Sequence, residues 1–132
     1  FDNWHEDTCE KLISIYTHNG YSRFTVGQAQ KWINMTFKYI FTYGEQRVAG
    51  FGNAYPYCHV PIDQTVLKEL KRYNFPKFNY PWSRIDNYND YLEKQIWVRH
   101  NFDIAPLDVE FKLWLGKELN INPVDSKTLD YS

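Results

Sequence analysis

The sequence predicts an all-α fold of about five helices around one buried central helix. Apolar residues recur with helical spacing in five segments, and no alternating strand pattern is longer than four residues. The stretch 24–44 is the longest and most apolar segment, so we expect the other helices to pack on it. With 132 residues, 43% of them hydrophobic, the chain fits one domain over residues 1–120 and a C-terminal tail over 121–132.

The first helix is expected to start at Asn3, which has Glu6 three residues later, and to end at the turn 18–20. Its inward stripe consists of Trp4, Thr8, Leu12, Ile13, Ile15 and Tyr16. A short link, residues 21–23, then leads into the central helix.

The central helix, about 25–43, carries signals at both ends. Thr25 and Gln28 have the spacing of a capping box, and Gly44 is a natural stop. Two apolar faces cover most of its circumference, namely Ala29, Ile33, Phe37, Ile40 and Phe41 on one side and Trp32, Met35, Tyr39 and Tyr43 on the other. Such a helix is expected to lie in the interior.

One polar stripe interrupts the apolar surface of the central helix. Lys31, Asn34 and Lys38 stand at i, i+3 and i+7, which places them on one side of the helix. The stripe is either the one solvent-exposed side of the helix or the surface at the bottom of a functional site.

The next segment, residues 45–60, reads as a loop with no convincing period. Pro61 is expected at the first position of a third helix, with Asp63 in its first turn and an apolar stripe that reaches Tyr73. The aromatic and proline-rich stretch 74–81 cannot continue that helix.

Two more helices complete the predicted fold. Asp86 or Asn87 caps a fourth helix through about Arg99, and Pro106 opens a fifth. We expect the inward side chains to be Tyr88, Tyr91, Leu92 and Ile96 in the fourth helix and Leu107, Phe111, Trp114 and Leu115 in the fifth.

Composition excludes several classes of protein. Fifteen basic and 16 acidic residues leave a formal charge of −1, so no global positive field points to a nucleic acid or membrane, although a local basic face stays open. Cys9 and Cys58 are too few for a disulfide framework, and the four histidines lack metal-ligand spacing, so no metal or other cofactor is expected. No membrane span or signal peptide is visible, which favours a soluble, cytoplasmic protein. Because the chain begins with Phe1, we expect a processed product, a fragment or a trimmed chain.

Lys31 and Asp63 are the candidate catalytic pair. A lysine amine attacks a sugar carbon only when it is neutral, and burial of Lys31 among Trp32 and Phe37 would favour that form. A nearby carboxylate, Asp63, would move protons or stabilise a developing sugar cation. The plain alternative is that Lys31 extends to solvent and Asp63 only caps its helix.

Three motifs, in order over about 25–116, carry a family resemblance. They are Val26-Gly27 before Gln30-Lys31, then Val60-Pro61-Ile62-Asp63, and last Ile104-Ala105-Pro106-Leu107-Asp108-Val109-Glu110 with Leu113-Trp114-Leu115. Asp63 follows Lys31 by 32 residues. This pattern resembles the catalytic half of the helix-hairpin-helix DNA glycosylases, in particular the archaeal 8-oxoguanine DNA glycosylase family often called AGOG.

The resemblance implies a DNA glycosylase, with or without strand-nicking lyase activity, that acts on a flipped damaged base. It implies that Lys31 attacks C1′ of the sugar and that Asp63 assists loss of the base. DNA is then the partner, and the expected nucleic-acid-binding residues are Gly27, Gln30, Asn34, Lys38 and Lys68. The chain has no clear counterpart of the family's first helical lobe, so a missing N-terminal lobe or a protein partner is also considered.

Two other function classes stay open. The first is a non-catalytic module that keeps the fold and binds DNA or protein through Lys38, Lys68, Lys71 and Arg72. The second is an interaction domain whose aromatic loops, 51–57 and 73–82, dock a partner. Contact between Lys31 and Asp63 in a cleft would favour the enzyme.

Overall fold

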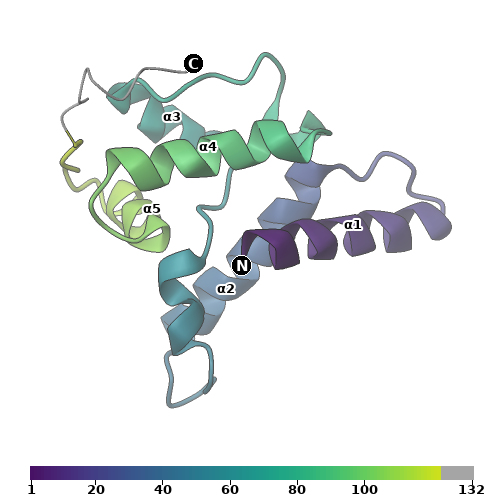
Figure 1. Ribbon diagram of the computed structural model, residues 1–132, viewed down its shortest axis with the longest axis horizontal. Coiled ribbons are helices and arrows are strands. Elements are labelled where there is room, and N and C mark those ends of the chain that lie inside the picture. Colours follow the sequence, from purple (N-terminus) through teal and green to yellow (C-terminus); the bar gives the residue numbers. More distant parts are fainter. Residues whose placement is uncertain (123–132) are drawn as a thin grey trace.

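The computed structural model describes residues 1–122, which form helices joined by loops (Figure 1). The helices are α1 (Asp2–His18), α2 (Val26–Tyr43), η1 (Gly52–Tyr57), α3 (Gln64–Leu70), η2 (Lys71–Tyr73), η3 (Trp82–Arg84), α4 (Tyr88–Asn101) and α5 (Pro106–Trp114), where η marks a 3-10 helix. The predicted all-α class is confirmed. Among the described residues the extended pairing is limited to an isolated bridge between Phe102 and Ile121.

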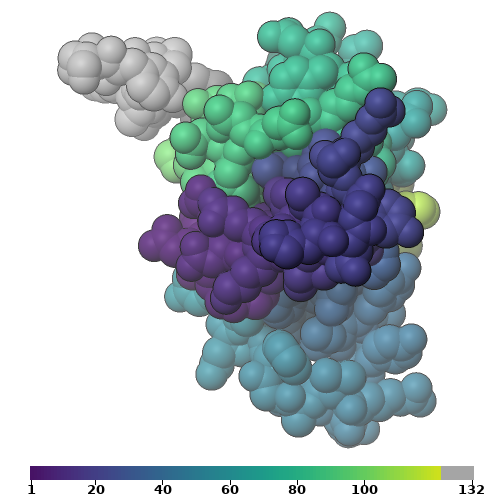
Figure 2. Space-filling model, turned by 90° about the vertical axis from the view of Figure 1, so that its right-hand side faces the viewer, coloured from purple at the N-terminus to yellow at the C-terminus, as the bar shows by residue number. Residues whose placement is uncertain are grey.

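The helix α2 contacts α1, α4 and η3, as expected of a central helix. In Figure 1, α1 leads away from the middle of α2, and α4 crosses in front of α3 while α5 folds back beneath the C-terminal end of α4. Figure 2 looks toward the C-terminal end of α1, which lies with the link after it across the middle of that face. The end of α2 and the loop after it lie below α1 in that view, and the N-terminal part of α4 lies above.

Local signals set the ends of α2 as predicted. Thr25 Oγ1 accepts a hydrogen bond from the Gln28 amide at 3.2 Å, and the Gln28 side chain accepts one from the Thr25 amide at 3.1 Å. Gly44 ends the helix with a φ of 85°, a conformation that glycine adopts without a side-chain penalty. Both cap predictions are therefore confirmed.

Two predicted helix starts are wrong. The α1 helix begins at Asp2 rather than Asn3, and α3 begins at Gln64 rather than Pro61. The backbone N–H and C=O of Ile62 both bond to a side chain of α2, so the chain at Pro61 and Ile62 is held outside the helix. Asp63 is the N-cap of α3, and its Oδ1 accepts a hydrogen bond from the Val66 amide at 2.9 Å.

The orientation of α2 differs from the predicted one. Its second apolar face lies toward solvent, since Trp32, Tyr39 and Tyr43 are 61, 54 and 60% exposed. The polar stripe turns inward instead: Asn34 is buried, and Lys31 and Lys38 form ion pairs. Partners on other elements satisfy these polar groups, which removes the usual cost of burying them.

Other predicted inward faces are rotated in the same way. In α1, Trp4 and Ile15 are exposed while His5 and Cys9 are buried. Ile96 of α4 and Trp114 and Leu115 of α5 are also exposed, and the buried side chains of these helices are Gln95, Val98, Val109, Glu110 and Leu113 beside the predicted Tyr88, Tyr91 and Leu107. Polar residues thus occupy core positions that an apolar pattern does not mark.

Two hydrophobic clusters form the core. The first combines α1, α2 and the start of α4, and the second combines α3, the end of α4 and α5. The extended segment 58–62 contributes to both, with Cys58 and Ile62 in the first cluster and Val60 in the second. Residues 121–122, predicted as the start of a tail, pair with 101–102. The rest of that predicted tail, 123–132, lies outside the described residues.

Candidate active site

The structure brings Lys31 and Asp63 together, as predicted. The Lys31 amine donates a hydrogen bond to Asp63 Oδ2, while Asp63 Oδ1 is held by the Val66 amide at the start of α3. The side chains of Lys31 and Asp63 are 29 and 15% exposed, so the pair is partly open to solvent. The expected burial of Lys31 beside Trp32 is wrong, because Trp32 lies on the exposed face of α2.

A glutamine side chain fixes the register between these two residues. Gln30 Oε1 accepts a hydrogen bond from the Ile62 amide at 3.0 Å, and Gln30 Nε2 donates to the Ile62 carbonyl at 2.7 Å. Gln30 and Ile62 directly precede Lys31 and Asp63, so the paired amide sets α2 and the start of α3 side by side. We call this pairing the Gln30 clamp.

An equivalent clamp acts from α4. Gln95 Oε1 accepts from the Val60 amide at 2.9 Å, and Gln95 Nε2 donates to the Val60 carbonyl at 2.8 Å. Both glutamines are fully buried. Loss of either side chain would leave buried backbone groups without hydrogen-bond partners, which is costly in the free energy of folding. The segment that leads to Asp63 is therefore held from both sides.

A second ion pair lies along α2, between Lys38 and Glu110 of α5. Lys38 Nζ lies 2.6 Å from Glu110 Oε1 and 4.9 Å from the centre of the Trp114 ring. Glu110 is 1% exposed; burial raises the pKa of its carboxyl, and the hydrogen bond from Lys38 opposes that shift. The charges of Asp63 and Lys31 also act on Glu110, so the four residues form one charged cluster.

One atom of this charged cluster lacks a protein partner. Glu110 Oε2 is buried and makes no hydrogen bond to the described residues. In the sequence Glu110 is the last residue of the motif 104–110 and has no predicted role of its own. Its position, three residues from both Leu107 and Leu113 on the inward face of α5, is the signal that it points inward.

A buried polar network extends from Asn34, the middle residue of the polar stripe of α2. Asn34 Oδ1 lies 2.8 Å from His5 Nε2, and Asn34 Nδ2 donates to Tyr91 Oη at 2.8 Å. His5 Nδ1 lies 2.8 Å from Tyr88 Oη, and His59 Nδ1 lies 2.8 Å from Tyr91 Oη. Burial lowers the pKa of His5 to about 3 and also lowers that of His59, so both rings are neutral near pH 7.

The network ends at an ion pair between α1 and α4. Asp2 accepts hydrogen bonds from both Arg99 Nη atoms, at 2.5 and 2.9 Å, and lies 2.7 Å from His59 Nε2. The bonds to His59 and Arg99 hold the pKa of the Asp2 carboxyl well below its usual range. These contacts give the network a structural role. The bond from Asn34 Nδ2 to Gln30 Oε1, at 2.9 Å, connects it to the Gln30 clamp.

Three predicted nucleic-acid-binding residues are buried and cannot serve that role in this structure. The Gly27 amide donates to the Ile85 carbonyl at 3.0 Å, and a Cβ at Gly27 would lie 1.9 Å from the Trp82 carbonyl oxygen. Gly27 therefore allows α2 to approach η3 closely and offers no amide to a phosphate. Gln30 and Asn34 are occupied by the clamp and the network.

The two predicted lysine contacts differ from one another. Lys38 is mostly buried against Glu110, so neutralising that carboxylate is its first role. Lys68 is exposed on α3 and remains available to a ligand.

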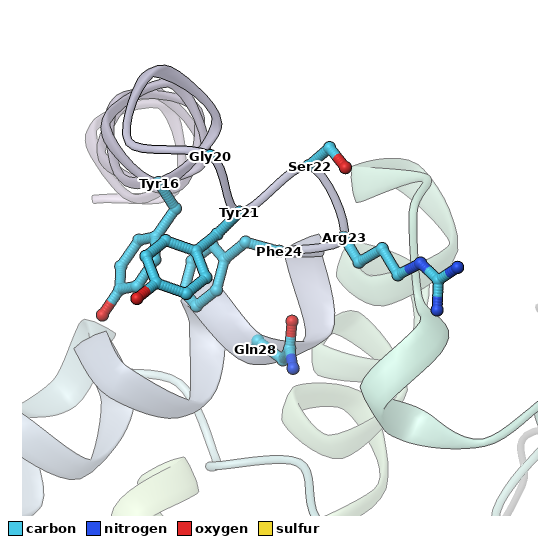
Figure 3. Close-up of a pocket in the computed structure, with 7 residues that line it drawn as sticks. All are labelled: Tyr16, Gly20, Tyr21, Ser22, Arg23, Phe24 and Gln28. Carbon is cyan, nitrogen blue, oxygen red and sulfur yellow. The ribbon is translucent and has the colours of Figure 1, made fainter.

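The link between α1 and α2 contains an open hollow of about 400 Å³. Tyr16 and Phe24 stack there with ring centres 3.9 Å apart, and Tyr21 meets Tyr16 edge-on at 5.8 Å. Figure 3 shows these rings gathered on one side of the link and the Arg23 side chain extending away from them. These ring contacts pack the link against the end of α1.

No protein-family model, curated protein or solved structure matches this chain. No helix among the described residues is long and apolar enough to cross a bilayer. In residues 1–122 no group of three or more His, Cys, Asp or Glu side chains is placed to hold a metal ion. The functional argument therefore rests on the geometry of the site.

Proposed function

We propose that this protein is a DNA glycosylase in which Lys31 is the nucleophile and Asp63 its proton-transfer partner. The observation that supports the proposal is the direct contact between the Lys31 amine and the Asp63 carboxylate at a site open to solvent. The contact joins two residues 32 positions apart, and the Gln30 clamp maintains it.

The proposed reaction starts with a damaged base turned out of its duplex. Lys31 Nζ forms a bond to C1′ as the bond between C1′ and the base nitrogen breaks, and the electron pair leaves with the base, which takes up a proton. Asp63 takes a proton from the Lys31 ammonium before the attack and passes it to the departing base. The carboxylate thereby regains the negative charge that stabilises the cationic sugar in the transition state. Opening of the sugar, with a proton passing to O4′, then leaves an imine between Lys31 and C1′.

The charged cluster suits this chemistry for an electrostatic reason. Asp63 is fixed by the α3 amide and by Lys31, so it is oriented before any substrate binds. Lys38 and Glu110 neutralise one another in the same charged cluster and are largely buried. Lys31 and Asp63 are therefore the more solvent-exposed pair of this cluster.

A binding module that keeps the fold without chemistry is the alternative. The exposed aromatic side chains of α2, Trp32, Tyr39 and Tyr43, favour it, because adjacent exposed rings are typical of contact surfaces. The two proposals differ in one measurable property, which is covalent capture of DNA.

Borohydride trapping tests the glycosylase proposal. The protein is incubated with duplexes that carry an oxidised purine, an oxidised pyrimidine or an abasic site, and borohydride reduces any imine to a stable amine. We expect an adduct that is abolished in Lys31→Gln. Asp63→Asn should slow base release yet still allow an adduct at a site that is already abasic.

Lys11→Gln is the matched control, because Lys11 is an exposed lysine of α1 that lines none of the sites described. Lys38→Gln is a poor control, since it would leave buried Glu110 uncompensated. An adduct that persists in Lys31→Gln would show that another amine reacts. No adduct on any of these substrates would favour the binding module.

A further inference from the structure

A groove of about 790 Å³ lies between α3 and the segment 75–83. We call it the lysine groove. Three exposed lysines line it, Lys68 from α3, Lys71 from η2 and Lys77 from the facing segment, and its lining contains no aspartate or glutamate. In a chain with a formal charge of −1, this is a local concentration of positive charge.

Aromatic rings form the other part of the lysine groove, and α4 holds them in place. Tyr80 Oη donates to Asp90 Oδ2 at 2.9 Å, and Lys94 Nζ lies 4.8 Å from the centre of the Phe78 ring. Phe75, at the base of the groove, meets Trp97 edge-on with ring centres 5.1 Å apart. The rings are therefore ordered before a ligand arrives, which lowers the entropic cost of binding.

The lysine groove begins beside the proposed catalytic pair. Gln64 lines the groove and is the residue after Asp63, which contacts Lys31. A polymer that places one unit at Lys31 can therefore continue into the groove. Lysines that track a phosphate backbone, combined with rings on which bases stack, are typical of single-strand nucleic-acid sites.

We propose that the lysine groove binds a single-stranded stretch of nucleic acid next to the nucleotide at Lys31. This inference rests on the proposed function, since it takes the occupant of the Lys31 site to be DNA. Because the lining contains lysines and no carboxylates, it favours an anionic ligand. The ordered rings favour an anion that carries bases, since bases stack on rings and a simple polyanion has none.

The test uses an undamaged, fluorescently labelled oligothymidylate of about eight nucleotides, within the range of single-strand sites. The reference is an oligomer of equal length made of tetrahydrofuran spacers, which has the same phosphates and no bases. We expect oligothymidylate to bind more tightly than the spacer oligomer, by about fivefold for each base that stacks.

Lysine variants connect that binding to the groove. In the double variant Lys71→Gln and Lys77→Gln we expect weaker binding and a salt dependence, log K against log salt, that is less steep by about 1.4, or 0.7 for each lost phosphate contact. The matched control is Lys11→Gln with Arg47→Gln, which removes the same charge from exposed positions outside the groove. We expect the control to keep most of the affinity.

Equal losses in the two double variants would overturn the proposal, because the charge would then act without regard to its place. Equal affinity for oligothymidylate and the spacer oligomer would overturn it as well, and so would tighter binding of undamaged duplex through the same lysines. Both oligomers are unreactive, so the assay also works in Lys31→Gln. If trapping fails while the groove variants still weaken oligothymidylate binding, only the glycosylase proposal is refuted. If trapping succeeds while binding does not depend on the groove lysines, only the groove proposal is refuted.

Discussion

Replacing Gln30 with methionine tests whether the clamp holds the catalytic pair. Methionine has a similar volume and no hydrogen-bonding amide, so packing is largely kept. The variant leaves the amide and carbonyl of fully buried Ile62 without their partners. At about 1–3 kcal/mol for each unsatisfied group, we expect a loss of about 2–6 kcal/mol in the free energy of unfolding. For 132 residues this corresponds to a fall in Tm of roughly 7–21 °C.

Gln95→Met is the matched control for this prediction. It removes the corresponding two hydrogen bonds from Val60, which is also fully buried. It should cost somewhat less stability, because the Val60 carbonyl keeps a hydrogen bond from Asn34 Nδ2 at 3.4 Å. Urea unfolding followed by circular dichroism measures both losses. Only Gln30 adjoins Lys31, so at a temperature where both variants are folded we expect the rate of borohydride trapping to fall further in Gln30→Met.

Two results would refute this reasoning. A loss of stability below about 1 kcal/mol in Gln30→Met would mean that the buried Ile62 groups find other partners. Equal trapping rates in the two variants would mean that the clamp contributes to stability without positioning Lys31.

The remaining predictions concern the charged cluster and the buried network. Lys38→Met should lower the free energy of unfolding, measured in urea, by about 3–5 kcal/mol, because it leaves the buried Glu110 carboxylate unpaired. Adding Glu110→Gln should restore most of that loss. A loss below about 1 kcal/mol in Lys38→Met would contradict the pairing. Stability should also fall in acid, because burial lowers the pKa of His5 to about 3 in the folded protein, against 6.5 for an unperturbed histidine. The contribution of His5 to stability is therefore complete above about pH 6.5 and is lost as the pH falls toward 3. The lowered pKa values of Asp2 and His59 act in the same direction, and a Tm that stays constant from pH 7 to 4 would refute this.

Signals confined to a few neighbouring residues were read correctly from the sequence. The capping box of Thr25 and Gln28, the stop at Gly44 and the cap at Asn87, one of the two caps predicted for α4, all involve groups within a few positions of one another. Such interactions form within the helix end itself and depend little on the rest of the fold. The α3 start was missed because its cause is distant: a side chain of α2 holds the backbone before Asp63.

The sequence by itself determined the helical class and most helix ends, and it singled out Lys31 and Asp63, which the fold brings into contact. Only the tertiary structure decided which face of α2 is buried, since periodicity shows which residues share a face and not which face finds matching partners. The polar stripe of α2 meets Asp63, Glu110 and His5, whereas its aromatic face meets solvent. A buried polar group is stable only when its hydrogen bonds are made, and those partners come from segments far away in the chain.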